Sequence, residues 1–229
     1  MHKLITVIGA VVLTTAASEA LAEASVGGRT GPYVRGDMFV SFMNMNDLGS
    51  GYSYKDDKWD QEFTRPGLSF GGGYDFGSFR SDVVFDYRRG KDLGKDLRPA
   101  AAHYPHVEAD IIAYSIMANG YWDIVEIGLS QGFGESEMTL TPYVGAGFGG
   151  VVLDTDTAWT DAYGGQGDAS HERHNLTWAL MAGVAVHVTE SVAVDAGWRY
   201  QDLGPLRTSQ FVFTDLTSHD LRLGLRYGF

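Results

Sequence analysis

Two groups of histidines have side chains of the kind that bind metals. The segment 171–174, His-Glu-Arg-His, places two imidazoles three positions apart, and His103 and His106 flank a Tyr-Pro pair. A zinc protease motif needs a helix and a glutamate at a different spacing from the two histidines, so the 171–174 segment does not match it. We predict that both groups are solvated loop residues and that the chain holds no metal.

Acidic and hydroxyl side chains give no stronger chemical signal. Asp154, Asp156 and Asp161 are oxygen ligands in type, but their spacing is not that of an EF-hand, so we predict a solvated acidic loop. A serine nucleophile needs an imidazole base within contact. The sequence places no histidine beside an inward serine at a strand end, and His187 is expected to be buried toward a turn. We therefore predict no catalytic residues, no cofactor and no enzyme activity.

Charged residues recur at every second position in several segments. Successive side chains of a β-strand point to opposite faces, so this alternation predicts strands with one charged and one apolar face. The charged faces collect Arg35, Asp37, Arg80, Asp82, Asp86, Arg88, Asp123, Asp195, Arg199, Asp220, Arg222 and Arg226. If about eight such strands close into a barrel, its interior is just wide enough for side chains to fill, and opposite charges must pair there. We predict a salt-bridged plug. A narrow gated pore is the alternative, although the near balance of Arg and Asp offers no ion-selective ring.

The elements that would position these charges are about eight strands joined by long and mostly short connections. The expected strands are 31–42, 64–76, 79–88, 110–123, 141–153, 175–188, 192–201 and 218–229. The expected long polar loops are 44–62, 89–108, 154–173 and 202–217. The connection 124–137 begins with an apolar run that could form a turn of helix, and the sequence leaves this open. Long loops at one end and short turns at the other are typical of outer-membrane barrels.

The last strand ends in a pattern of its own. Its apolar face runs from Leu221 to an aromatic end, and Arg222, Gly224, Tyr227 and Phe229 fill every defined position of a known motif. The segment resembles the C-terminal assembly signal of Gram-negative outer-membrane β-barrels. The resemblance implies recognition by the barrel-assembly machinery, whereas periodicity alone indicates only an amphipathic strand.

The rest of the chain resembles the same class of protein. The segments 142–147, 182–186 and 195–204 are similar to those of small porin-like and opacity-type outer-membrane proteins, which are related to the transmembrane domain of outer membrane protein A. The resemblance covers nearly all of the chain after its first 22 residues. It implies an all-β, antiparallel, up-and-down transmembrane barrel of about eight strands in the cell outer membrane, in contact with outer-membrane lipid and lipopolysaccharide.

Length, charge and the N-terminal segment agree with that class. The chain has 229 residues, no Cys and a formal net charge of −12, so it has no disulfide framework and no basic patch for nucleic acid. Lys3, the apolar run 4–13 and the Ala20-Leu21-Ala22 site predict a cleaved signal peptide over residues 1–22, with cleavage after Ala24 as the alternative. The domain expected to remain is 23–229.

From the sequence we expect a non-enzymatic integral outer-membrane protein. Its barrel would anchor four long surface loops, with an envelope-structural role or a role in contacting a surface ligand whose identity the sequence does not give. The alternatives are a narrow small-solute porin and, from a third class, a lipid-modifying barrel enzyme.

Overall fold

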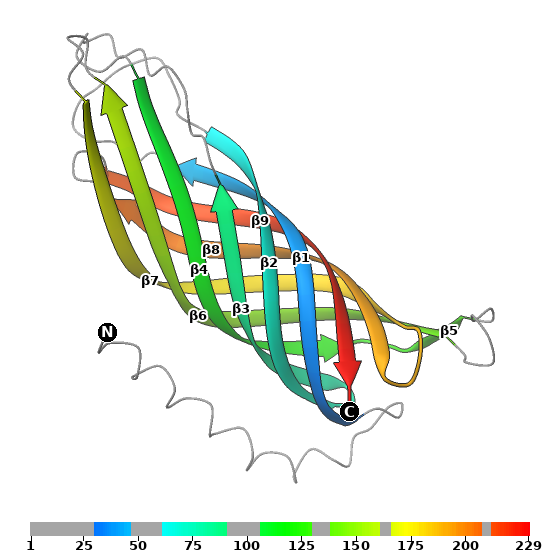
Figure 1. The fold of residues 1–229 in the computed structure, drawn as a ribbon. Coiled ribbons are helices and arrows are strands. Elements are labelled where there is room, and N and C mark those ends of the chain that lie inside the picture. Colours follow the sequence, from blue (N-terminus) through cyan, green and yellow to red (C-terminus); the bar gives the residue numbers. More distant parts are fainter. Residues whose placement is uncertain (1–29, 47–60, 91–105, 130–137, 161–165, 208–211) are drawn as a thin grey trace.

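The computed structural model describes residues 30–46, 61–90, 106–129, 138–160, 166–207 and 212–229, and Figure 1 shows these parts as one strongly tilted sheet. The strands within them are β1 (Thr30–Asn46), β2 (Gln61–Phe76), β3 (Phe79–Gly90), β4 (His106–Asp123), β5 (Ile127–Leu129), β6 (Met138–Thr160), β7 (Gln166–His187), β8 (Val192–Arg207) and β9 (Val212–Gly228). None of the described residues forms a helix long and apolar enough to cross a membrane. The predicted signal peptide lies outside the described residues.

Eight of these strands close into a barrel. Each pairs antiparallel with its neighbours in the sheet, β1 pairs with β9, and β4 pairs with β6. Met38 of β1, for example, lies opposite Leu68 on one side and Leu223 on the other. Closure leaves no unpaired sheet edge in the barrel wall, so the backbone groups there are satisfied within the sheet. The predicted eight-stranded, up-and-down antiparallel barrel is confirmed.

The two faces of the wall differ as the alternation predicts. Met38, Phe70 and Phe148 point outward and are 61%, 65% and 66% exposed. Asp86 and Asp220 point inward and are 0% exposed. Apolar side chains therefore cover the outside, and charged side chains are enclosed within the barrel.

The two ends of the barrel differ in their connections. The turn end carries the connections 77–78, 124–137 and 188–191, and the loop end carries 47–60, 91–105, 161–165 and 208–211. At the turn end, Gly77 adopts a positive φ of 99°, and its N–H donates to Asp75 Oδ1 at 2.9 Å. A residue without a Cβ adopts this backbone conformation at little cost, so glycine suits the tight turn between β2 and β3.

Two predicted loops are wrong in their extent. The segment predicted as a loop over 154–173 lies mostly in β6 and β7, which stay paired from Asp154↔Glu172 to Thr160↔Gln166. Likewise β8 runs to Arg207 and β9 begins at Val212, within the predicted loop 202–217. Polar residues on both faces suggested loops, but a strand that extends past the apolar part of the barrel's outer face can be polar on both faces.

The remaining connections differ less from prediction. β1 extends four residues and β3 two residues past their predicted ends, and most of the predicted loops 44–62 and 89–108 lies outside the described residues. In the connection 124–137, residues 127–129 form β5, which pairs with β6 from Ile127↔Leu140 to Leu129↔Met138. The undecided turn of helix is therefore a short strand.

Three strands reach farther than the others at the loop end (Figure 1). β4 remains paired with β6 as far as His106↔Thr160, whereas β3 ends opposite Ile111. Pairing between β7 and β8 stops at Trp178↔Asp202. We call residues 106–112, 154–160 and 166–174 the projecting sheet.

Candidate functional site in the barrel lumen

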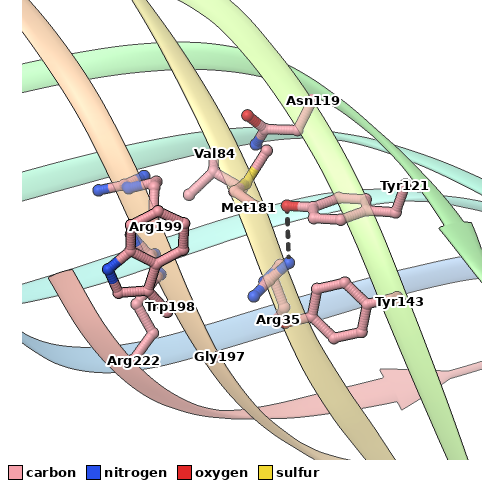
Figure 2. A pocket seen from close by; sticks show the side chains of 10 residues that line it. All are labelled: Arg35, Val84, Asn119, Tyr121, Tyr143, Met181, Gly197, Trp198, Arg199 and Arg222. Carbon is pink, nitrogen blue, oxygen red and sulfur yellow. Dashed lines mark hydrogen bonds between the residues drawn. The ribbon is translucent and has the colours of Figure 1, made fainter. Parts of the chain in front are cut away.

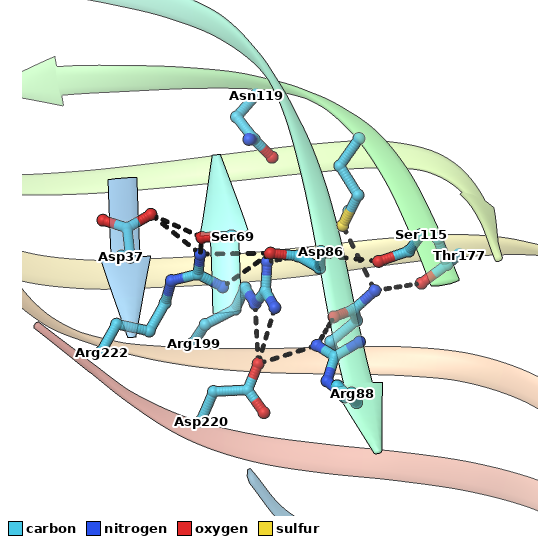
Figure 3. Close-up of polar contacts among 12 residues, drawn as sticks. Asp37, Ser69, Asp86, Arg88, Ser115, Asn119, Thr177, Arg199, Asp220 and Arg222 are labelled. Atoms are coloured by element: carbon cyan, nitrogen blue, oxygen red, sulfur yellow. Dashed lines mark hydrogen bonds and ion pairs between the residues drawn. The ribbon is translucent and has the colours of Figure 1, made fainter. Parts of the chain in front are cut away.

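The centre of the lumen is a network of buried ion pairs (Figure 3). Arg199 of β8 donates to Asp220 Oδ2 from Nη2 at 2.7 Å and to Asp86 Oδ2 from Nη1 at 2.9 Å. Arg88 of β3 reaches the same Asp220 oxygen at 3.0 Å, and the Ser41 hydroxyl lies 2.6 Å from Asp220 Oδ1. Each carboxylate thus has several charged or hydroxyl donors, which is the condition for keeping a charge buried.

A second set of pairs joins this centre to β1. Arg222 of β9 contacts Asp37 at 3.1 Å and Asp86 at 3.2 Å. Arg35 forms a two-point contact with Asp37, from Nη2 at 2.8 Å and Nε at 3.2 Å, and also reaches Asp82 at 3.0 Å. The structure therefore connects Arg and Asp side chains from β1, β3, β8 and β9 into one network across the lumen.

Phe39 lies inside this network, and the sequence analysis did not identify it. The side chain is 3% exposed, and the guanidinium carbons of Arg222, Arg88 and Arg199 lie 4.7, 5.0 and 5.6 Å from its ring centroid. Three cations around one ring gain cation–π attraction. The sequence did contain a signal for its position, because alternation along β1 places Phe39 on the same inward face as Asp37 and Ser41.

The charges near the turn end differ in how tightly they are paired. Arg80 forms a two-point pair with Asp123, with both contacts at 2.8 Å. Asp195, in contrast, lies 3.9 Å from Arg80 and 3.6 Å from Arg226, and Arg226 lies 3.7 Å from Asp75. Asp75 was not predicted as a network member, although it falls on the inward face of β2. These longer separations leave room for bridging water.

An apolar layer lies between the charge network and the loop end. Its buried members are Met43, Ala113, Val151, Leu153, Leu203 and Leu216. They come from β1, β4, β6, β8 and β9, so they span much of the lumen cross-section. The expectation of a lumen filled by charges missed this layer, because an inward apolar residue near a strand end looks like a break in the alternation.

Little free space remains within the network. A cavity of about 10 Å³ lies among Arg35, Tyr121, Tyr143 and Met181, as Figure 2 shows, and this is close to the minimum that holds one water. A larger cavity of about 640 Å³ opens at the turn end, where Tyr33, Asp75, His187 and Arg226 are among its lining residues. The lumen is thus closed at its centre and widens at the turn end.

The four residues of the terminal motif divide between the two faces of β9. Tyr227 and Phe229 point outward, with ring centroids 5.2 Å apart. Arg222 belongs to the charge network, and a Cβ on Gly224 would lie 1.9 Å from Asp37 Oδ1. Arg222 and Gly224 therefore have packing roles in the lumen, whatever role the motif has in assembly.

The candidate metal ligands within the described part of the chain do not converge. His174 is on strand β7 rather than in the predicted loop, where its Nε2 lies 2.8 Å from Glu172 Oε1 and both side chains are exposed. Asp154 and Asp156 lie on β6, also within the wrongly predicted loop. His106 begins β4, while His103 and Asp161 lie outside the described residues. The described part of the chain contains no group of three or more potential metal-ligating His, Cys, Asp or Glu residues.

Comparisons with known proteins agree with the fold. A family model described as outer membrane protein beta-barrel domain matches residues 8–229. The chain is 28% identical over 200 residues to an uncharacterised protein of Brucella suis biovar 1, which covers 74% of this chain and 67% of that protein. It is 24% identical over 239 residues to outer membrane protein PagN of Salmonella typhimurium, covering 90% and 93% of the two chains.

A solved structure shows the same fold. Neisserial surface protein A superposes with a TM-score of 0.52 at 20% sequence identity, covering 89% of this chain and 100% of that one. At this identity, the similarity concerns the fold alone.

Proposed function

The chain belongs to the outer membrane protein beta-barrel domain family and is an outer-membrane β-barrel protein, and from this premise we propose that it is a non-conducting, non-enzymatic anchor. Its barrel holds the four connections of the loop end on the outer side of the membrane, in an envelope-structural or surface-interaction role. Its partners in the membrane are lipid and lipopolysaccharide, and the barrel-assembly machinery recognises its last strand during insertion.

The observation that carries the proposal is the closed centre of the lumen. Asp86 and Asp220 are fully buried and each is held by at least two Arg side chains. Removing one partner from a buried ion pair costs about 3–5 kcal/mol, so a passing ion would have to separate pairs that resist separation. The apolar layer around Leu153 and Leu216 adds a second barrier, since a narrow hydrophobic constriction excludes water.

The orientation follows from the architecture of this class. Outer-membrane barrels have short periplasmic turns and longer external connections around an apolar band about 25 Å tall. Trp122 and Tyr227 lie at the turn end of the apolar face, as interfacial aromatics do, and Phe42 lies toward the loop end. We therefore place the turn end in the periplasm and the loop end outside the cell.

Conductance in planar bilayers tests the anchor. The purified parent protein should insert without stable single-channel steps. A multiple variant, Arg199→Ala and Asp220→Ala together with Leu153→Ala and Leu216→Ala, removes one buried pair and thins the apolar layer, and it should conduct, which provides a positive control for insertion. Stable steps from the parent would overturn the non-conducting anchor.

The large cavity is the observation that favours a narrow pore as the second candidate. Its volume of about 640 Å³ admits water and small solutes from the turn end. If the central pairs and the apolar layer can open together, the barrel is a gated small-solute pore. Steps in the parent whose frequency depends on voltage would favour this candidate.

Lumen serines bear on the enzyme alternative. Ser41, Ser69 and Ser115 lie within hydrogen-bond distance of the carboxylates of Asp220, Asp37 and Asp86 at 2.6, 2.8 and 3.2 Å. A carboxylate held by Arg side chains is a weak base, so these pairs do not provide an activated nucleophile. Incubation of the folded protein with phospholipid and lipopolysaccharide, followed by mass spectrometry, should show no change in acyl chains. Turnover by the parent that Ser41→Ala abolishes would contradict this expectation.

A further inference from the structure

β7 continues outside the barrel wall, where one of its two edges meets none of the described strands. From Thr177 back to the start of β7, no strand in the described part of the chain pairs with the side of β7 that faces away from β6. The side chains of Thr177 and Asn175 still bond to carbonyls of β8, at Asp202 and Leu203, which leaves residues 166–174 as the open edge. Nine residues of strand span about 30 Å, long enough to pair with a whole extended segment.

The open edge lies beyond the apolar band. Along the outward face of β7, toward the loop end, the apolar residues Trp178 and Leu176 are followed by the polar residues His174 and Glu172. Leu176 is 81% exposed. Every second residue of the edge points its backbone N–H and C=O away from β6, so these groups form a template for strand addition. Strand addition to such an edge is a common mode of peptide recognition, with affinity from the backbone and specificity from alternate side chains.

The outward face beside this edge carries four acidic side chains, whereas the exposed Arg173 lies on the other face of β7. Asp168 and Glu172 lie on one face of β7, and Asp154 and Asp156 share that face on β6. Asp154 lies directly opposite Glu172, where like charges destabilise a strand pair, and Glu172 Oε1 also lies 2.8 Å from His174 Nε2. A cationic side chain on an added strand would relieve this repulsion.

Pairing of this edge with the same edge of a second copy is disfavoured in the register centred on Ser170. Antiparallel self-pairing centred on Ser170 would place Asp168 of each copy opposite Glu172 of the other, and both contacts would be repulsive. The edge therefore favours a foreign strand with basic residues.

We propose that the open edge of β7 binds an extended segment of a partner protein that carries two Lys or Arg residues four positions apart, facing Asp168 and Glu172. This inference rests on the proposed function, because it requires the projecting sheet to lie outside the cell. It identifies the partner class of a surface-interaction role as a basic β-strand.

A peptide series tests the edge. The probe is a short capped peptide of alternating threonine and valine with two lysines four positions apart, labelled for fluorescence anisotropy against the folded protein in detergent. Two further peptides carry backbone N-methyl groups, one peptide along one of its edges and the other peptide along the opposite edge. Methylation preserves the charge of each peptide and removes the backbone N–H donors of the methylated edge. The parent peptide and one methylated form should bind, and the other methylated form should bind at least about tenfold more weakly.

Charge variants complete the test. Asp168→Asn with Glu172→Gln should weaken binding by roughly tenfold without lowering thermal stability, since the second change removes a like-charge contact. Glu190→Gln, in the exposed turn at the opposite end, is the matched control and should leave binding unchanged. Equal binding of both methylated peptides, or equal binding of the lysine peptide and a lysine-free one, would overturn the proposal. Neither outcome would alter conductance or barrel folding, so the experiment tests the edge proposal independently of the proposed anchor function.

Discussion

Arg199 and Asp220 lie directly opposite each other on β8 and β9, and their side chains meet inside the barrel with Nη2 and Oδ2 2.7 Å apart. Asp220 also accepts from Arg88 at 3.0 Å. Asp220→Ala should therefore lower the free energy of unfolding by about 3–5 kcal/mol, because it removes the shared partner of two buried cations. Urea unfolding of the refolded protein in detergent, followed by tryptophan fluorescence, measures this change.

The control for Asp220 is an acidic residue without a buried partner. Glu190→Ala, exposed in the turn between β7 and β8, should change the free energy of unfolding by no more than about 0.5 kcal/mol. Similar losses for the two variants would mean that the lumen pairs contribute nothing beyond removal of a surface charge.

Gly224 gives a test of close packing beneath the charge network. An alanine Cβ at this position would lie 1.9 Å from Asp37 Oδ1, and that carboxylate is held by Arg35 and Arg222. Gly224→Ala should lower stability in detergent by about 1–3 kcal/mol, as overpacking does. In Gly36→Ala the new Cβ would lie 3.8 Å from the nearest atom, Ser69 O, so this variant is the matched control and should fold like the parent.

The result for Gly224 separates two explanations of the same residue. If glycine is needed only as part of an assembly signal, Gly224→Ala will refold normally in detergent and insert poorly in cells. If it is needed for packing, both refolding and insertion will suffer.

Closure of the barrel predicts resistance to detergent. Because β1 pairs with β9 and β4 pairs with β6, unfolding requires the loss of many strand pairs at once. Unboiled and boiled samples should therefore migrate differently on a denaturing gel. Identical mobility in several detergents would be inconsistent with a closed barrel.

The sequence was sufficient for the parts of the fold in which one face meets lipid and the other does not. In β3, Val83 and Asp82 fall on opposite faces, and the structure places Val83 41% exposed outside and Asp82 4% exposed inside. Strict alternation sets the strand and its orientation together, because a slip of one residue would exchange the two faces.

Alternation fails where the environment of a strand changes along its length. β6 and β7 extend past the apolar band and continue with polar residues on both faces. The segment that contains the pair Asp154↔Glu172 was therefore predicted as a loop. Inside the barrel, Phe39 and Met43 interrupt the expected run of charges. Phe39 faces three Arg side chains and Met43 belongs to the apolar layer, and both environments are formed by residues of other strands. Pairings such as Arg199 with both Asp86 and Asp220 depend on the closure of the whole sheet, which a single sequence does not specify.

The last strand allows packing and assembly to be separated. Phe229 is 76% exposed on the outer face, where its backbone N–H donates to Pro32 O at 3.1 Å. If Phe229 only covers the barrel wall, deleting it should cost no more than about 1.5–3 kcal/mol, the contribution of one large apolar side chain, which a closed barrel tolerates. If it is also read by the assembly machinery, its deletion and Tyr227→Ala should sharply reduce the amount of protein in the outer membrane, while both purified variants refold nearly normally in detergent. Leu225→Ala is the control, because Leu225 shares the outer face and is 59% exposed but lies outside the defined positions of the motif. Membrane fractionation with quantitative blotting measures insertion, and equal amounts of the parent and all three variants would reduce the segment to an ordinary closing strand.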